Sequence, residues 1–289
     1  MTYTEQGVKK ELFAAASGAS SLSSQPAVGV GEKHFAELIR GVVARFPEKI
    51  RAGQMQEADR FAYHVSLIAS RKGVRARVSD IGGGWGTFAL GCAAAGMEVV
   101  MVDDFQDRGF FDADTMAAMR RLYDEYGVEL RSQDVVADGL GLPAESFDAI
   151  TSFDCFEHLH HSPKRLVAQI RDALRPRGLF VLGLPNCVNL RKRITVPFGI
   201  GKWSPMEEWY ESEVFRGHVR EPDVDDLLYI ARDMKLVDVQ VYGRNWMGYI
   251  SRFNLVRALT PFLDRLLRLR PTLCSDIYVV GTKSSAHDN

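Results

Sequence analysis

The sequence has few cysteines, no long apolar run and no excess of charge of either sign. No C-x-x-C pair occurs, so reduced cysteines in a cytosolic protein are expected; the four are Cys92, Cys155, Cys187 and Cys274. No segment approaches the roughly 18 to 20 apolar residues of a membrane span. With 36 Lys and Arg residues against 37 Asp and Glu residues, the overall charge does not indicate a nucleic-acid partner.

The length of 289 residues suffices for one large domain with insertions or for two small domains. Residues 1–30 are predicted to be disordered or flexible, because they include a polar, low-complexity tract. Apolar residues recur at helical spacing in 31–74, which predicts two or three helices. These helices either cover an edge of the sheet or form part of a lid over a substrate.

From residue 75 onward, strand-like segments alternate with helix-like segments, and Asp114 is predicted to cap a helix that ends at Tyr126. The predicted strands are 75–81, 98–102, 128–133, 147–153, 178–184, 236–242 and 276–281. This alternation predicts an α/β domain over 75–289 with a doubly wound, mostly parallel, seven-stranded Rossmann-like sheet. The pattern breaks at 187–221 and 243–273, and we expect these two insertions to form a substrate-recognition cap.

A glycine-rich turn, Gly82 to Gly86, ends the first strand and opens a helix. Glycine permits positive φ and lets a ligand approach main-chain N–H groups closely, so the turn predicts a nucleotide-type site. A dinucleotide site requires G-x-G-x-x-G. Here Thr87 stands at the third glycine position, and the third glycine comes one residue early.

Three acidic residues stand at or near the ends of the first three strands, namely Asp80, Asp103 and Asp134. A carboxylate at 103 can accept both hydroxyls of a ribose, and one at 134 can accept an adenine amino group. Together the three acids suit an uncharged adenosine with a cationic tail better than a pyrophosphate, which they would repel.

Over residues 75–185 the chain resembles the class I S-adenosylmethionine-dependent methyltransferases. Several segments match motifs of that family in its order and spacing: Val78–Gly86, Met101–Asp103, Gly127–Asp134, Leu142–Asp148, Phe156–Leu159, Leu174–Gly178 and Gly183–Asn186. One departure is Arg177, which replaces the first glycine of the family's L-x-P-G-G.

The resemblance implies S-adenosylmethionine as cofactor. The resemblance implies that the backbone of Gly82, Gly84 and Gly86 lies at the methionine and ribose. It implies that Asp80 lies near the methionine amino end and Asp103 at the ribose. It places Asp134 at the adenine and Asp154 at the pocket mouth. Four residues more than usual separate Asp134 from Leu142, so Asp138 is an alternative at the adenine.

The implied reaction is an in-line displacement at the methyl group, and an alcohol acceptor must also lose its proton. His158 is the first candidate base and His218 the second. Alternatively, Glu157 and His158 only pack beneath the cofactor, and His218 is an ordinary loop residue. No metal is expected, because adjacent histidines such as His160 and His161 rarely converge on one ion.

The E-H-L motif, the Pro-Asn pair and the long insertion resemble the ubiquinone and sugar O-methylating branches. The predicted reaction is therefore O-methylation of a hydroxyl on a glycan, sugar conjugate or small metabolite. The alternatives are an aromatic or quinone-type hydroxyl, or a cofactor-binding module without catalysis. The arginine-rich amphipathic segment 252–270 is expected to pack on the domain, with peripheral membrane contact or dimer contact as alternatives. The sequence does not indicate the oligomeric state.

Overall fold

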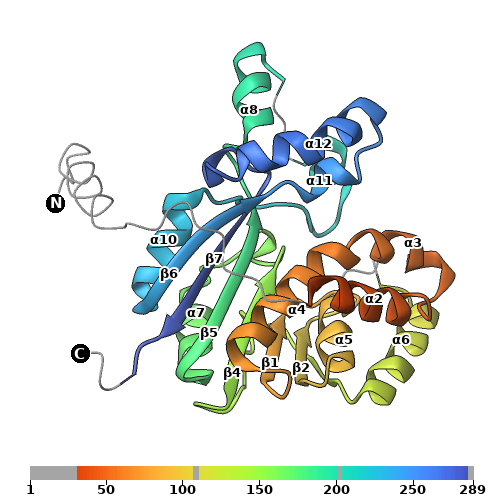
Figure 1. Ribbon diagram of the computed structural model, residues 1–289, viewed down its shortest axis with the longest axis vertical. Helices are drawn as coiled ribbons and strands as arrows, with labels where there is room; N and C mark the ends of the chain where they lie inside the picture. The colour runs from red at the N-terminus through yellow and green to blue at the C-terminus, as the bar shows by residue number, and fades with distance from the viewer. Residues whose placement is uncertain (1–30, 107–110, 201–203, 286–289) are drawn as a thin grey trace.

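A computed structural model describes residues 31–106, 111–200 and 204–285 (Figure 1). The prediction for residues 1–30 lies outside the described residues. Seven strands form one sheet: β1 (Arg77–Ile81), β2 (Glu98–Asp103), β3 (Glu129–Ser132), β4 (Phe147–Phe153), β5 (Leu174–Pro185), β6 (Leu236–Arg244) and β7 (Asp276–Lys283). Their order is β3-β2-β1-β4-β5-β7-β6, and β7 runs antiparallel to both of its neighbours. The predicted doubly wound, mostly parallel sheet is confirmed.

One strand begins well before its predicted start. β5 starts at Leu174 instead of Gly178, because Leu174 pairs with Phe147 across a register irregularity. Pro176 lies within this irregular segment, and a bulge is one of the few places where a strand tolerates proline.

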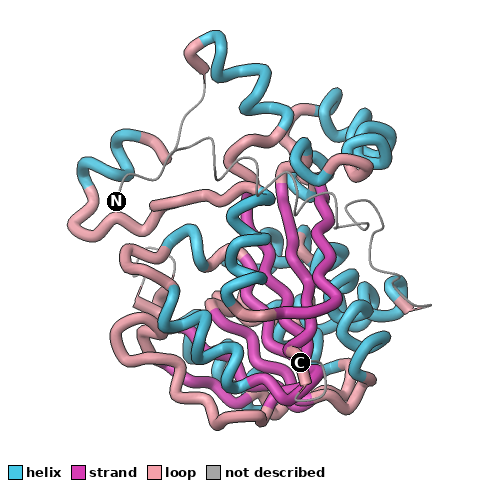
Figure 2. Tube along the Cα trace, turned by 90° about the vertical axis from the view of Figure 1, so that its left-hand side faces the viewer, coloured by secondary structure: helices cyan, strands magenta, loops and turns pink. Residues whose placement is uncertain are grey.

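Helices cover both faces of the sheet (Figure 2). One face carries α2 (Glu32–Val43), α4 (Ala58–Lys72), α5 (Thr87–Ala94) and α6 (Ala113–Tyr126), and the other carries α7 (Lys164–Ala173) and α10 (Val224–Asp233). Each group encloses its own cluster of buried apolar side chains against the strands. The short α3 (Glu48–Gln56) joins α2 to α4, so the N-terminal segment holds three helices.

The predicted N-cap of α6 is wrong by two residues. Asp112 is the N-cap, and its side chain accepts a hydrogen bond from the Thr115 N–H at 2.9 Å. Asp114 lies in the first helical turn, where a negative charge interacts favourably with the helix dipole.

Both late insertions contain helices. The first contains α8 (Leu190–Thr195), η2 (Val196–Phe198) and α9 (Met206–Glu211), and the second contains α11 (Trp246–Tyr249), α12 (Asn254–Leu267) and η3 (Pro271–Leu273). Figure 1 shows α8, α11 and α12 beyond the ends of β5 and β6. The buried Asn186 joins the insertions, because its amide donates to the carbonyls of Thr272 and Cys274 at 3.0 and 2.9 Å.

The expected packing of the 252–270 apolar face on the domain is wrong. Leu255 is 71% exposed and Phe262 68% exposed. The buried residues of α12 are polar, Thr260 and Asp264, and Asp264 accepts hydrogen bonds from the Asn245 amide and the Tyr249 hydroxyl. This polar network holds the helix with its apolar face outward. Across the described ranges, no helix combines the length and apolarity needed to cross a bilayer.

Candidate functional site

A cavity of about 580 Å³ lies where β1, β2, β3 and β4 end. The glycine turn after β1 and the residues that follow the other three strands form its floor and sides. Helices α3 and α4 add Gln54, Arg60 and Phe61, the residue between these helices adds Glu57, and the insertions add Arg216 and Met247. The N-terminal helices therefore both cover the sheet and line the cavity.

The structure brings six of the predicted site residues to this cavity: Gly82, Gly84, Asp103, Asp134, Asp154 and His158. Four others do not line it. Asp80 and Gly86 lie behind the glycine turn, Asp138 is exposed outside the cavity, and His218 lies behind His158.

The glycine turn has no room for side chains where it meets β4. Gly82 has φ +72°, and a Cβ there would lie 2.4 Å from the Cys155 Sγ. Gly84 has φ +55°, and a Cβ there would meet nothing within 4 Å. Because Gly84 lines the cavity, bare backbone faces this open space, as close approach of a ligand requires.

Asp103 links the end of β2 to this turn. One carboxylate oxygen accepts from the Gly84 N–H at 2.9 Å, and the other accepts from the Phe105 N–H at 3.0 Å. Burial raises the pKa of this carboxyl. Asp103 also lines the cavity.

Asp134, rather than the alternative Asp138, stands in the cavity wall. One oxygen of Asp134 accepts from the N–H groups of Val136 and Ala137 at 2.8 and 3.0 Å. Asp138 accepts from the Asp134 N–H at 3.2 Å and so supports the same turn from outside.

Arg60 is a cavity residue that the sequence did not reveal. It is only 8% exposed, and its Nη1 lies 2.6 Å from an Asp154 carboxylate oxygen. Its Nε–H donates to the Tyr278 hydroxyl at 3.2 Å, whereas its buried Nη2 has no hydrogen-bond partner among the described residues. The sequence feature that could have indicated this role is the charged Arg60 on the otherwise apolar face of α4, four residues before the buried His64.

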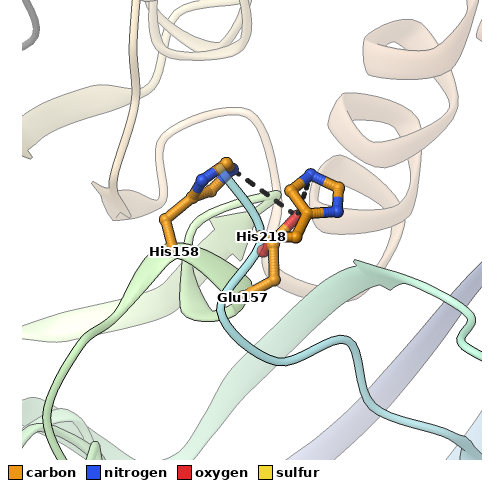
Figure 3. A group of neighbouring side chains, drawn as sticks. All are labelled: Glu157, His158 and His218. Atoms are coloured by element: carbon orange, nitrogen blue, oxygen red, sulfur yellow. Dashed lines mark ion pairs between the residues drawn. The ribbon is translucent and has the colours of Figure 1, made fainter. Parts of the chain in front are cut away.

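Glu157 and His158 in η1 (Phe156–His158) meet His218 from the first insertion (Figure 3). The Nε2 atoms of both histidines lie 4.0 Å from the same Glu157 carboxylate oxygen. The two imidazole rings are 4.9 Å apart, edge to face. The two candidate bases, distant in sequence, are therefore neighbours.

Both imidazoles are held through Nδ1. His158 Nδ1 is 2.7 Å from the Arg216 carbonyl oxygen, and His218 Nδ1 is 2.8 Å from a Glu221 carboxylate oxygen. Burial lowers the pKa of His158, which favours its neutral form. Glu157 is 1% exposed, and burial raises the pKa of its carboxyl well above the usual range.

A family model described as a methyltransferase domain matches residues 33–241, well over half of the chain. The chain belongs to the class I S-adenosylmethionine-dependent methyltransferases. No curated protein sequence shows a significant match to it.

Several solved structures are similar to this methyltransferase. The 1,6-didemethyltoxoflavin-N1-methyltransferase of Burkholderia thailandensis is 18% identical with a TM-score of 0.51, over 91% of this chain and 94% of that one. A SAM-dependent methyltransferase of Archaeoglobus fulgidus is 18% identical with a TM-score of 0.49, over 87% and 97%. Phosphoethanolamine N-methyltransferase 2 of Haemonchus contortus is 18% identical with a TM-score of 0.46; the match covers 73% of this chain and 49% of that one, so it spans about half of that protein.

The cavity of the methyltransferase fits its cofactor, S-adenosylmethionine. The bare backbone at Gly84 leaves space for a close contact, and the Asp103 carboxylate stands beside it. The unpartnered Arg60 Nη2 supplies a buried donor next to Asp154. An adenosine with an amino-acid tail offers partners for all three groups.

Asp80 should make the stability of the methyltransferase depend on pH. Burial raises its pKa from the ordinary 3.8 to about 7, while the Thr151 hydroxyl donates to it at 2.8 Å. Because the folded state holds this proton more tightly than the unfolded chain, stability falls as pH rises between these two values. In urea titrations, the difference in unfolding free energy between Asp80→Asn and wild type should change in favour of the variant by about 2–3 kcal/mol as the pH is raised from about 5 to about 8. Asp138→Asn is the control for loss of an exposed carboxyl, and a constant difference between Asp80→Asn and wild type would contradict the expectation.

Proposed function

We propose that this methyltransferase methylates a hydroxyl group on a glycan, sugar conjugate or other small metabolite. The observation that carries the proposal is the Glu157–His158–His218 cluster, which reaches the cavity through His158. A neutral hydroxyl is a weak nucleophile until its proton is removed, and groups of this kind can remove it. The E-H-L motif that contains Glu157 and His158 also resembles the sugar and ubiquinone O-methylating branches.

The cofactor-binding roles follow the cavity walls. Asp103 accepts the ribose hydroxyls, Asp134 accepts the adenine amino group, and the backbone at Gly82 and Gly84 lies against the ribose and methionine. Asp154 binds the methionine ammonium, and the free Nη2 of Arg60 donates to the methionine carboxylate. Asp80 and Gly86 act indirectly: Asp80 supports the turn from behind, and Gly86 permits the contact of the turn with Tyr123.

The proposed mechanism places the acceptor hydroxyl beside His158. The bound cofactor supplies a methyl group on a good leaving group, so much of the acceleration comes from positioning. A carbonyl oxygen only accepts hydrogen bonds, so His158 carries its hydrogen on Nδ1 and its lone pair on Nε2. His158 Nε2 takes the hydroxyl proton, and the negative charge of Asp154 stabilises the imidazolium that forms.

Two other classes of acceptor are candidates. An aromatic or quinone-type hydroxyl needs the same proton transfer and suits the aromatic wall of Phe61, Trp85 and Phe111. The similar enzyme from Burkholderia thailandensis is named as an N-methyltransferase, but an amine acceptor makes less use of a base. The intact Asp80, Asp103 and glycine turn argue against a module that binds the cofactor without catalysis.

The outward face of α12 favours an acceptor at a membrane surface, such as a lipid-linked conjugate. Its apolar side chains are exposed, and Arg252, Arg265 and Arg270 are exposed along the same segment. Exposed apolar residues flanked by arginine bind interfaces that contain anionic lipids. Peripheral contact would bring the cap, and the site below it, to such an acceptor.

Asp103→Ala should weaken S-adenosylmethionine binding by about tenfold or more, since each hydrogen bond to a charged group contributes about 1.5–3 kcal/mol. Isothermal titration calorimetry measures the dissociation constant. Asp138→Ala, outside the cavity, is the matched control and should change it little. Unchanged affinity in Asp103→Ala would remove Asp103 from the site, and no binding by the wild type would overturn the proposed function.

His158→Ala should lower turnover by about 10²-fold or more, the size typical of general base catalysis, while cofactor affinity is retained. Turnover is measured by the formation of S-adenosylhomocysteine with a panel of hydroxylated acceptors. His161→Ala, an exposed histidine in the same loop, should retain wild-type turnover. Full activity in His158→Ala would move the proposed base to His218.

The double variant Leu255→Ser with Phe262→Ser should lose binding to phosphatidylglycerol vesicles in a co-sedimentation assay, because both side chains are exposed and apolar. The wild type should bind these vesicles more strongly than pure phosphatidylcholine. Tyr229→Ser, at an equally exposed site on α10, is the control. Failure of the wild type to sediment, with dimers in solution that the double variant abolishes, would assign the face to self-association instead.

A further inference from the structure

Glu157, His158 and His218 bring three potential ligand atoms to one point (Figure 3). The atoms all lie within 4.8 Å of one another, and each Nε2 is 4.0 Å from the Glu157 oxygen. The backbone fixes this meeting, because the Glu157 carbonyl oxygen accepts from the N–H groups of Val219 and Arg220 at 2.7 and 3.1 Å. Hydrogen bonds thus clamp the loop that carries His218 onto η1.

The two imidazoles turn their lone pairs toward the carboxylate. Nδ1 of His158 donates to the Arg216 carbonyl, and Nδ1 of His218 donates to the Glu221 carboxylate. Both acceptors lack a hydrogen to donate, so the lone pairs of the neutral rings lie on Nε2. Glu221 is itself held by Lys192. Histidines that bind metals almost always have their other ring nitrogen bonded to a carbonyl or carboxylate in this way.

The Glu157 carboxyl group makes no hydrogen bond to any described residue. Its side chain is buried, and within the described part of the chain neither oxygen has a hydrogen-bond partner. Buried polar atoms are nearly always satisfied. The group therefore points to a ligand between Glu157 and the two Nε2 atoms.

We infer that Glu157, His158 and His218 bind a divalent transition-metal ion of the zinc class. Two histidines and one glutamate form a ligand set of catalytic zinc sites, which keep a further position open. Imidazole favours zinc over magnesium or calcium, which prefer oxygen ligands. Two ligands of a tetrahedral zinc lie roughly 3.4 Å apart. Each imidazole therefore needs to approach the Glu157 oxygen by about 0.6 Å, and no two of the three ligand atoms need to approach by more than about 1.4 Å.

The adjacent histidines belong outside this set. His160 Nε2 is 2.8 Å from the Phe215 carbonyl oxygen, and His161 is exposed. The sequence predicts no metal ion, because only His160 and His161 are neighbouring histidines in it. The tertiary contact with His218 supplies the second imidazole instead.

The site deepens the proposed function and rests on it for its catalytic role. Through His158 the open position adjoins the cavity, where the acceptor hydroxyl would bind the ion. Because His158 Nε2 would hold the ion, it would no longer take the hydroxyl proton as it does in the metal-free mechanism above. Metal coordination lowers the pKa of a bound oxygen strongly, so the hydroxyl proton would leave to solvent instead. The oxygen keeps its electron pair and attacks the methyl carbon, and the carbon–sulfur bond breaks with its pair on sulfur.

Titration of the metal-free full-length protein with zinc chloride should show one bound ion per chain. Glu157→Gln and His218→Ala should weaken binding at least about tenfold, the lower limit for loss of even an outer-shell partner. His161→Ala is the matched control and should bind as the wild type does. X-ray absorption of the zinc-loaded wild type needs no variant and should show imidazole and oxygen ligands without sulfur.

Absence of zinc binding by the wild type would overturn the inference, as would equal binding in the Glu157→Gln and His218→Ala proteins. A sulfur ligand would place the ion at a cysteine, and tighter binding of magnesium than of zinc would also contradict the inference. Cofactor binding and methyl transfer are measured separately. Transfer to hydroxyl acceptors without a metal at this site would leave the proposed function intact, and zinc binding without such transfer would leave the metal site intact.

Discussion

The buried guanidinium of Arg60 is the interaction on which the cavity depends. A charge held out of solvent is stable only when it is paired. Arg60 forms an ion pair with Asp154, which follows β4, and donates a hydrogen bond to the Tyr278 hydroxyl on β7. This requirement holds α4 against the ends of both strands. Because α4 also carries Phe61 to the cavity wall, and Glu57 just before it lies there too, the N-terminal helices form part of the cavity.

The second constraint is the close approach of β1 and β4 at their ends. A side chain at Gly82 would collide with Cys155, so glycine lets the turn lie against the segment that leads to η1. Parallel strands end at one edge of a sheet, and their acidic residues therefore collect there. The result is a cavity with bare backbone at Gly84 and carboxylates at Asp103, Asp134 and Asp154.

The cap has two faces with different chemistry. Its inner face is polar: Asn186 joins the two insertions, and Asp264 holds α12 through Asn245 and Tyr249. Its outer face is apolar and rich in arginine. The same first insertion supplies His218 to the cluster at η1. The His218 cluster and the exposed apolar face thus lie on the two late insertions, which Asn186 joins.

The sequence by itself determined the sheet, the glycine turn and the family, because strand alternation and the spacing from Asp80 to Asp134 are local patterns. It also placed Asp103 and Asp154 correctly at strand ends. Only the tertiary structure decided which residues meet. Arg60 joined the cavity and His218 met His158 because distant segments pack together, and α12 exposes its apolar face because buried polar contacts at Asp264 outweigh the amphipathic pattern.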